Sequence, residues 1–296
     1  MPGPRLPNDF QTVTVGQITA IARPGDVDLA VSLAERADQP TSWYGLGRRS
    51  AGRVALMVVR GPEAFRAVAR GRVPAWGAGL ALPAARFIAL RADGEDPFRV
   101  LRHELAHLVL HDAITGRVPL WFDEGYAVVA AGEFGRLTEF GLNFAVATGR
   151  VPGLETLNAG LRGGESTAET SYALAASAVA FLDQRAGGIE SLLRKLVDGV
   201  GFDTAVAITT GMNPGRFEET WQRNVKRHYG LGLWFMAGGI WVLVAGLVLV
   251  AHAVRKRRDI PRREALNQGW VLPPEDPLPA PPAEGTAEPA NPSSDA

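Results

Sequence analysis

The N-terminal part of the chain alternates between patterns typical of short strands and of short helices. Residues 12–21 alternate apolar and polar side chains with the period of two that predicts a β-strand. Residues 26–37 repeat apolar side chains at the three- and four-residue spacing of an amphipathic helix. A second strand is predicted at 53–59, around the apolar run VALMVV, and Pro62 then opens a helix that extends to Ala69.

The pattern becomes helical after the first third of the chain. The stretch GAGLALPAARFIAL at 77–90 predicts one or two further strands interrupted by Pro83. From Pro97 onward, nearly every apolar pattern in the globular part is helical. We therefore expect an α+β fold in which a small, mainly antiparallel sheet precedes a helical half.

An uninterrupted apolar run, LGLWFMAGGIWVLVAGLVLVAHAV, lies between Leu231 and Val254 and contains no charged residue. About 20 apolar residues of helix cross the roughly 30 Å hydrocarbon core of a bilayer. Trp234 and Trp241 fit an interfacial or upper-leaflet position. The run predicts one C-terminal transmembrane helix in preference to a buried core helix, because core helices are rarely so uniformly apolar over this length.

More basic residues follow the predicted span than precede it. The positive-inside rule then places the C-terminal tail in the cytoplasm and the globular domain outside it. This single-pass orientation needs an export signal, which the N-terminal sequence MPGPRLPNDFQTVTVGQ does not show. A tail-anchored protein whose domain faces the cytoplasm is the alternative.

The composition divides the chain into four predicted segments. Residues 1–11 are an N-terminal segment, 12–230 a globular domain, 231–254 the transmembrane helix, and 255–296 a basic juxtamembrane segment with a disordered Pro- and Ala-rich tail. The 31 basic and 31 acidic residues balance, which argues against a nucleic-acid partner. Because the chain has no cysteine, nitrogen and oxygen atoms must hold any bound metal.

The candidate chemistry lies in the helix predicted after Asp96 and Pro97, a side chain and a proline typical of a helix start. In its sequence HELAH, His103 and His107 are four residues apart and lie on one helix face, where a single metal ion can bridge them. Glu104 is placed beside that metal as a base. This pattern is typical of one catalytic zinc ion, although a histidine pair without a metal is the alternative.

A catalytic zinc needs a third protein ligand, which the segment WFDEGYA can supply. Glu124 is the candidate, on a helix that folds back after a short loop, and Gly125 permits a close helix approach there. Asp123 either orients a ligand imidazole, caps the helix or is an exposed charge. His111 competes for the third position, but the chain lacks the glycine and histidine of the metzincin pattern at Leu110 and Ala113.

Together, HELAH and WFDEGYA resemble the gluzincin metallopeptidases, and most of all the compact bacterial proteins with a peptidase MA-like domain. The likeness extends over the predicted globular domain. It implies that His103, His107 and Glu124 hold one Zn²⁺ ion and that Glu104 is the general base. In thermolysin, an aspartate follows the third-ligand glutamate by four residues. This chain departs from that pattern, because Val128 stands four residues after Glu124.

The mechanism that this resemblance implies uses a zinc ion to lower the pKa of its water to about 7. Glu104 accepts the proton as the water attacks a peptide carbonyl, and then passes it to the leaving amine. Related enzymes place a tyrosine on a later helix, so Tyr172 is a candidate donor to the oxyanion, and a core role for it is equally open. The resemblance also implies an edge strand that pairs with an extended substrate, for which the candidates are Arg86, Phe87, Ile88, Ala89 and Leu90.

The leading hypothesis is a membrane-anchored zinc peptidase that acts on a peptide or protein substrate. Two alternatives stay open: a membrane-anchored zinc-containing binding or scaffold domain without proteolysis, and a zinc hydrolase of another amide or ester. The intact Glu104 argues against the first alternative, because a domain without catalysis has no need of the base.

Overall fold

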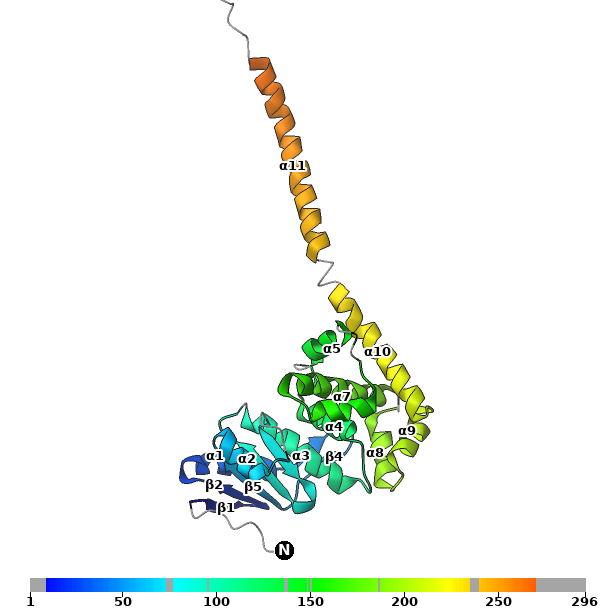
Figure 1. Ribbon diagram of the computed structural model, residues 1–296. Helices are drawn as coiled ribbons and strands as arrows, with labels where there is room; N and C mark the ends of the chain where they lie inside the picture. Colours follow the sequence, from blue (N-terminus) through cyan, green and yellow to red (C-terminus); the bar gives the residue numbers. More distant parts are fainter. Residues whose placement is uncertain are drawn as a thin grey trace, which may run out of the picture. The chain divides into compact units, whose positions relative to one another are not determined.

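The computed structural model describes residues 9–72, 77–94, 96–135, 138–147, 149, 151–185, 187–234 and 240–269. The chain separates into two compact units, Met1–Gly238 and Gly239–Ala296 (Figure 1). The predicted disordered tail lies outside the described residues from position 270 onward.

The first unit contains two β-sheets, the larger of which is mixed. The strands of the unit are β1 (Gln11–Val15), β2 (Ile18–Ala22), β3 (Thr41–Trp43), β4 (Gly47–Arg49), β5 (Val54–Val59), β6 (Gly79–Leu82) and β7 (Phe87–Arg91). Five of them form one sheet in the order β1-β2-β5-β7-β6, and β3 pairs with β4 separately. The central strands β2, β5 and β7 are parallel, whereas β1 and β6 pair antiparallel at the two edges. The prediction of a mainly antiparallel sheet is therefore wrong at the centre of the sheet.

The connections between the central strands account for their parallel direction. Between β2 and β5 lies α1 (Val27–Asp38), which returns the chain so that β5 runs in the same direction as β2. After β5 come α2 (Pro62–Ala69) and then β6, which runs antiparallel to β7, so that β7 is again parallel to β5. The single strand predicted at 12–21 is instead the β1–β2 hairpin, which turns at Gly16 with a φ of 55°.

The rest of the first unit is helical. The helices are α3 (Pro97–Ala113), α4 (Leu120–Ala131), α5 (Thr138–Ala147), α6 (Leu154–Leu161), α7 (Glu165–Arg185), α8 (Ile189–Val197), α9 (Phe202–Thr210) and α10 (Pro214–Trp234). The predicted α+β class, with a small sheet followed by a helical half, is confirmed.

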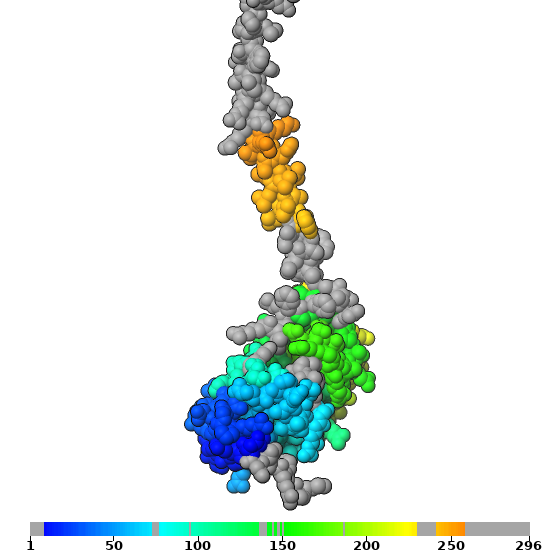
Figure 2. All heavy atoms as spheres, turned by 60° about the vertical axis from the view of Figure 1, so that its left-hand side comes forward, coloured from blue at the N-terminus to red at the C-terminus, as the bar shows by residue number. Residues whose placement is uncertain are grey.

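The two faces of the sheet bury alternate residues of the same strand. Leu56 and Val58 of β5 belong to a large core to which α1 and α3 also contribute, whereas Met57 and Val59 belong to a smaller cluster with α2. This alternation follows from the two-residue repeat of a strand. In Figure 2, the blue and cyan residues of the sheet region occupy an area of the surface next to the green helical residues. One face of the sheet thus packs against α3, and the helices of the helical half follow α3 in the chain.

A close contact fixes α4 against α7. A Cβ atom at Gly125 would lie 2.5 Å from the carbonyl oxygen of Ala175 and 2.9 Å from a methyl group of Val179. Such distances leave no room for a side chain, so the prediction that Gly125 permits a close helix approach is confirmed. The position of α4, which carries Asp123 and Glu124, is therefore set by main-chain contact with α7.

The apolar run predicted to cross a membrane is divided between two helices. α10 ends at Trp234, α11 (Ile240–Gly269) begins at Ile240, and residues 235–239 lie outside the described residues. The apolar part of α11, 240–254, has 15 residues, or about 22 Å of helix, and a strongly basic segment follows it. No helix among the described residues is long and apolar enough to cross a bilayer. The predicted transmembrane helix at 231–254 and the predicted single-pass membrane localisation, in either orientation, are therefore wrong.

Candidate metal centre

Helix α3 begins as its sequence predicts. The side chain of Asp96 accepts hydrogen bonds from the main-chain N–H groups of Phe98 (3.0 Å) and Arg99 (3.4 Å), and Pro97 is the first helical residue. The cap satisfies donors that the helix itself leaves unpaired. Buried leucines of α3 pack into the core, which leaves the face with His103 and His107 turned towards α4.

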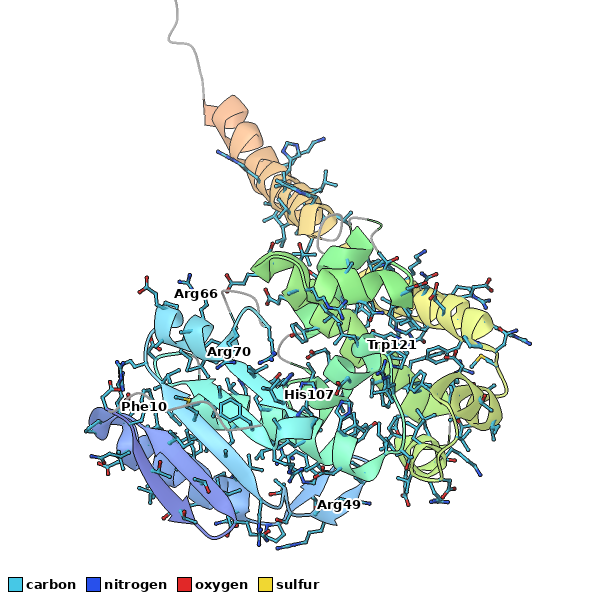
Figure 3. All side chains as sticks on the ribbon, turned by 60° about the horizontal axis from the view of Figure 1, so that its bottom comes forward. Phe10, Arg49, Arg66, Arg70, His107 and Trp121 are labelled. Atoms are coloured by element: carbon cyan, nitrogen blue, oxygen red, sulfur yellow. The ribbon has the colours of Figure 1, made fainter. Side chains whose placement is uncertain are left out.

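Helix α4 brings a carboxylate to both imidazoles. The Oε2 atom of Glu124 lies 3.5 Å from Nε2 of His103 and 3.6 Å from Nε2 of His107. Ligand atoms from these three residues all lie within 4.8 Å of one another. The group lies inside the first unit, where Figure 3 shows His107 between the strands and the helical half. The structure thus brings together the three residues predicted to hold a metal.

The spacing of these atoms fits one zinc ion. A tetrahedral zinc with bonds of about 2.0–2.1 Å separates its ligand atoms by about 3.3–3.4 Å. The two distances from Glu124 are close to this value and exceed the roughly 2.7–3.2 Å of an ordinary N–H···O hydrogen bond. Two imidazoles and one carboxylate are also a ligand set that zinc uses in hydrolytic sites. The residues present therefore fit zinc in their chemistry, and the two distances from Glu124 fit its spacing.

Asp123 connects the imidazoles at positions 107 and 111. Nδ1 of His107 donates to Oδ1 of Asp123 at 2.7 Å, and Nε2 of His111 donates to Oδ2 at 2.8 Å. Among the alternatives for Asp123, these contacts favour the one in which it orients a ligand imidazole. His111 lies outside the three-residue group that could hold a metal. Its partner is the Asp123 carboxylate.

A third carboxylate near the imidazoles, that of Glu133, has no counterpart among the sequence predictions. Oε2 of Glu133 lies 3.4 Å from Nδ1 of His103, and Oε1 lies 3.8 Å from Nε of Arg99. Glu133 follows Gly132, which ends α4 in a left-handed conformation with a φ of 77°. A glycine at a helix end is a recognisable sequence signal, but it does not reveal which way the next side chain turns.

The buried charges of the cluster balance one another. Burial lowers the pKa of His103, but the carboxylates of Glu124 and Glu133 outweigh this and raise it to about 9. Burial raises the pKa of Glu124, but the imidazoles of His107 and His103 lower it to about 2. The metal-free cluster therefore consists of imidazolium and carboxylate groups, and a metal ion that binds here must displace protons.

Glu104 and Tyr172 border this cluster. Burial raises the pKa of the Glu104 carboxyl, although the neighbouring imidazoles of His103 and His107 oppose the shift. Burial also raises the pKa of Tyr172 well above its usual value, and the carboxylates of Glu124 and Glu104 add to this. The Tyr172 ring stands edge-on to His103, with centroids 6.2 Å apart. Tyr172 thus remains a hydrogen-bond donor throughout the neutral pH range.

The strand predicted to hold a substrate lies inside the sheet. β7, which contains Phe87 to Leu90, pairs with β5 on one side and β6 on the other, so it has no open edge. Arg86 precedes this strand in a left-handed conformation, and its side chain donates to the carbonyl oxygen of Arg53 and pairs with Asp112. The prediction of an edge strand at 86–90 is therefore wrong, because the β6–β7 hairpin adds one more strand.

Among the described strands, the edge strand of the sheet beside α3 is β6. The N–H of Arg91 donates to the carbonyl oxygen of Ala78 at 2.8 Å. Because hydrogen-bonded pairs alternate along an antiparallel ladder, the main-chain groups of Gly79 and Ala81 point to the free side. A Cβ atom at Gly79 would lie 2.3 Å from Oε1 of Glu104. The edge strand thus passes directly beside the predicted base.

If Glu104 is the base that the sequence predicts, replacing Gly79 by alanine is expected to lower kcat/KM by about 10- to 100-fold, because the new methyl group must displace the Glu104 carboxylate by roughly 1 Å and also contacts Val100 at 2.7 Å. Steady-state kinetics of the metal-loaded protein will measure this. Gly25→Ala is the matched control, since a Cβ there meets no atom within 4 Å. Equal rates for both variants would show that Glu104 does not depend on the space at Gly79.

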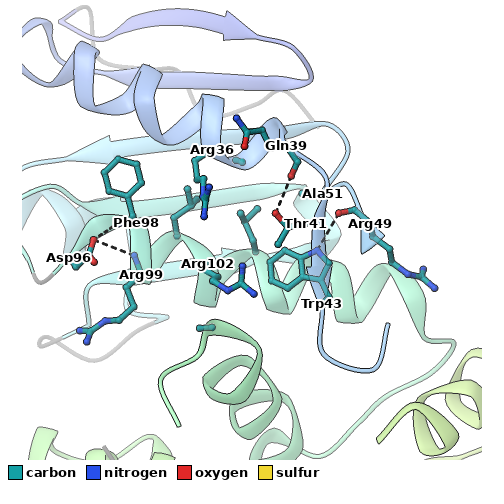
Figure 4. Close-up of a pocket in the computed structure, with 14 residues that line it drawn as sticks. Arg36, Gln39, Thr41, Trp43, Arg49, Ala51, Asp96, Phe98, Arg99 and Arg102 are labelled. Atoms are coloured by element: carbon teal, nitrogen blue, oxygen red, sulfur yellow. Dashed lines mark hydrogen bonds between the residues drawn. The ribbon is translucent and has the colours of Figure 1, made fainter. Parts of the chain in front are cut away.

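A cavity of about 240 Å³ lies on the opposite side of α3 and is lined by Leu101 and Leu105 (Figure 4). In it, the guanidinium of Arg102 lies 5.2 Å from the centre of the Trp43 ring and donates to the carbonyl oxygen of Ala130 at 2.9 Å. Neither imidazole of the cluster lines this cavity. Arg102 instead ties the C-terminal end of α4 to α3.

The comparison with protein families agrees with this architecture. The Peptidase MA superfamily matches residues 55–227, which is more than half of the 296-residue chain and includes α3, α4 and α7. A comparison with curated proteins finds no match. The chain therefore belongs to the Peptidase MA superfamily and carries a peptidase-like enzyme domain.

Proposed function

We propose that this chain is a zinc-dependent peptidase of the gluzincin type, in which His103, His107 and Glu124 hold one zinc ion. The observation that carries the proposal is the placement of Glu124 at 3.5 and 3.6 Å from the two Nε2 atoms. Membership of the Peptidase MA superfamily supports the same activity. The domain in this proposal is residues 12–230, and its partner is a peptide or protein substrate.

Glu104 is the general base of the proposed reaction. A zinc ion bound at the three ligands would polarise the scissile carbonyl and make an attacking water more acidic. Glu104 takes up the proton of that water and delivers it to the leaving amine, for which a raised pKa is favourable because it lies closer to neutral pH. Its burial, with 7% of the residue exposed, also keeps the carboxylate away from competing solvent.

Tyr172 and Asp123 have supporting roles. The phenol of Tyr172, which stays protonated, donates a hydrogen bond to the carbonyl oxygen as negative charge develops on it. Asp123 accepts a hydrogen bond from Nδ1 of His107 and so leaves Nε2 free to bind the metal.

The edge strand β6 holds the substrate in this proposal. The outward main-chain groups of Gly79 and Ala81 pair with an extended peptide, which places a peptide bond beside Glu104. Main-chain pairing does not depend on side chains and therefore accepts many sequences.

The metal requirement tests this function directly. Metal analysis of the chain purified in zinc-containing buffer is expected to give about one zinc per molecule, and a peptide library is expected to be cleaved. Chelation should abolish cleavage and added zinc should restore it, since the ion supplies the electrophile. Absence of bound zinc, or cleavage that persists with chelator, would contradict the proposal.

A further inference from the structure

Both nitrogen atoms of each imidazole in the cluster face a carboxylate. The Nε2 atoms of His103 and His107 face Glu124, while Nδ1 of His107 donates to Asp123 at 2.7 Å and Nδ1 of His103 lies 3.4 Å from Oε2 of Glu133. Each of the two outer carboxylates thus faces the Nδ1 atom of one imidazole, and the contact of Glu133 is the longer one. We propose that Glu133 is a positioning residue that orients His103 for metal binding, an inference that rests on the zinc function proposed above.

The end of α4 fixes the main chain of Glu133. The N–H of Gly132 donates to the carbonyl oxygen of Val129 at 3.0 Å. The N–H of Glu133 donates to the carbonyl oxygen of Val128, also at 3.0 Å. This pair of hydrogen bonds closes the helix in the motif that a left-handed glycine permits. Because Asp123 and Glu124 lie on the same helix, the main chains of all three acidic residues belong to α4 or are hydrogen-bonded to it.

The residue type at position 133 departs from the usual form of this motif. The position after the glycine commonly carries an apolar side chain that packs back on the last turn of the helix. Here it carries a carboxylate with 12% of its side chain exposed. A largely buried charge requires partners, and those of Glu133 are Nδ1 of His103 and, at 3.8 Å, Nε of Arg99. A local rule broken at a buried position is typical of a functional site.

Position 128, which corresponds to an aspartate in thermolysin, carries no carboxylate in this chain. The helix position four residues after Glu124 is Val128, which is buried in the core. The carboxylate for His103 instead comes from the turn after the helix. Arg102 supports this turn, because it donates to the carbonyl oxygen of Ala130 in the last turn of α4.

A carboxylate on Nδ1 affects a ligand imidazole in two ways. It holds the proton on Nδ1, so that Nε2 keeps its lone pair for the metal, and it fixes the rotation of the ring. Loss of such a partner commonly weakens metal binding by about 10- to 100-fold. Glu133 acts through His103 and need not touch the substrate.

The test uses the full chain with Glu133→Ala and Glu133→Gln, and Glu155→Ala as a control at an exposed glutamate of α6. Zinc affinity is measured by competition with a chromophoric chelator, together with kcat, KM and the unfolding temperature of the metal-free protein. Glu133→Ala is expected to bind zinc about 10- to 100-fold more weakly. Glu133→Gln should lose less, because its amide oxygen still accepts from Nδ1 of His103. KM should stay close to the wild-type value.

The outcomes separate this inference from the function on which it rests. Wild-type zinc affinity in folded Glu133→Ala and Glu133→Gln, in a chain that binds zinc and cleaves peptide, overturns the role of Glu133 alone. A lowered unfolding temperature of the metal-free variants with unchanged zinc affinity also overturns it, since that result assigns Glu133 to the ion pair with Arg99. A wild-type chain that binds no zinc rejects the proposed function as well.

Discussion

Replacing Glu104 by glutamine is expected to lower kcat/KM for peptide cleavage by about 10²- to 10⁴-fold while the zinc content stays the same. Glutamine has the shape of glutamate but cannot accept a proton from water at neutral pH. Glu104 lies outside the group of three ligand residues, so the metal does not depend on it. The loss corresponds to about 3–5 kcal/mol of transition-state stabilisation.

The measurement combines steady-state kinetics with metal analysis of the same samples. Glu63→Gln is the control, because Glu63 is an exposed glutamate in the first turn of α2. The proposed mechanism predicts that only Glu104→Gln loses activity and that both variants keep about one zinc. Undiminished cleavage by zinc-loaded Glu104→Gln would reject Glu104 as the base. Loss of both zinc and activity would instead point to a role for Glu104 in the structure of the cluster.

The features of α3 and α4 that sequence could predict depend on residues close together in the chain. Asp96 and Pro97 mark the start of a helix, and the four-residue interval between His103 and His107 defines one face of it. Glu124 follows after one short loop, so few arrangements of the two helices are available. Such local constraints limit where the side chains of His103, His107 and Glu124 can lie, whatever the rest of the fold.

Features that depend on distant pairing were beyond sequence analysis. β7 is an apolar run typical of a buried strand, but its place inside the sheet depends on β6, which pairs with it across the turn at Pro83. Glu133 gives no periodic signal at all, because its side-chain direction follows from the turn at Gly132. Hydrophobic periodicity reports burial along one element and carries no information on edges, ends or turns.

Removal of the proposed third ligand is expected to weaken zinc binding severely. Glu124→Ala leaves two imidazoles, and its zinc affinity should fall by more than the roughly 100-fold that loss of an orienting partner causes. The substitution should preserve α4 itself, because alanine has the highest helix propensity and Gly125 still contacts α7. Circular dichroism of the variant is therefore expected to match the wild type while cleavage is lost.

His111→Ala is the decisive comparison for this prediction, because His111 is the other residue that sequence analysis considered as the third ligand. In the structure, the imidazole of His111 donates to Asp123 at 2.8 Å and does not belong to the group that surrounds the metal position. Its removal leaves the hydrogen bond between Asp123 and His107 in place, so His111→Ala should keep most of its zinc affinity. Tight zinc binding by Glu124→Ala together with loss in His111→Ala would reverse the assignment and place the third ligand on α3. The opposite pattern would place the third ligand on α4, whose position is set by the close contact between Gly125 and α7.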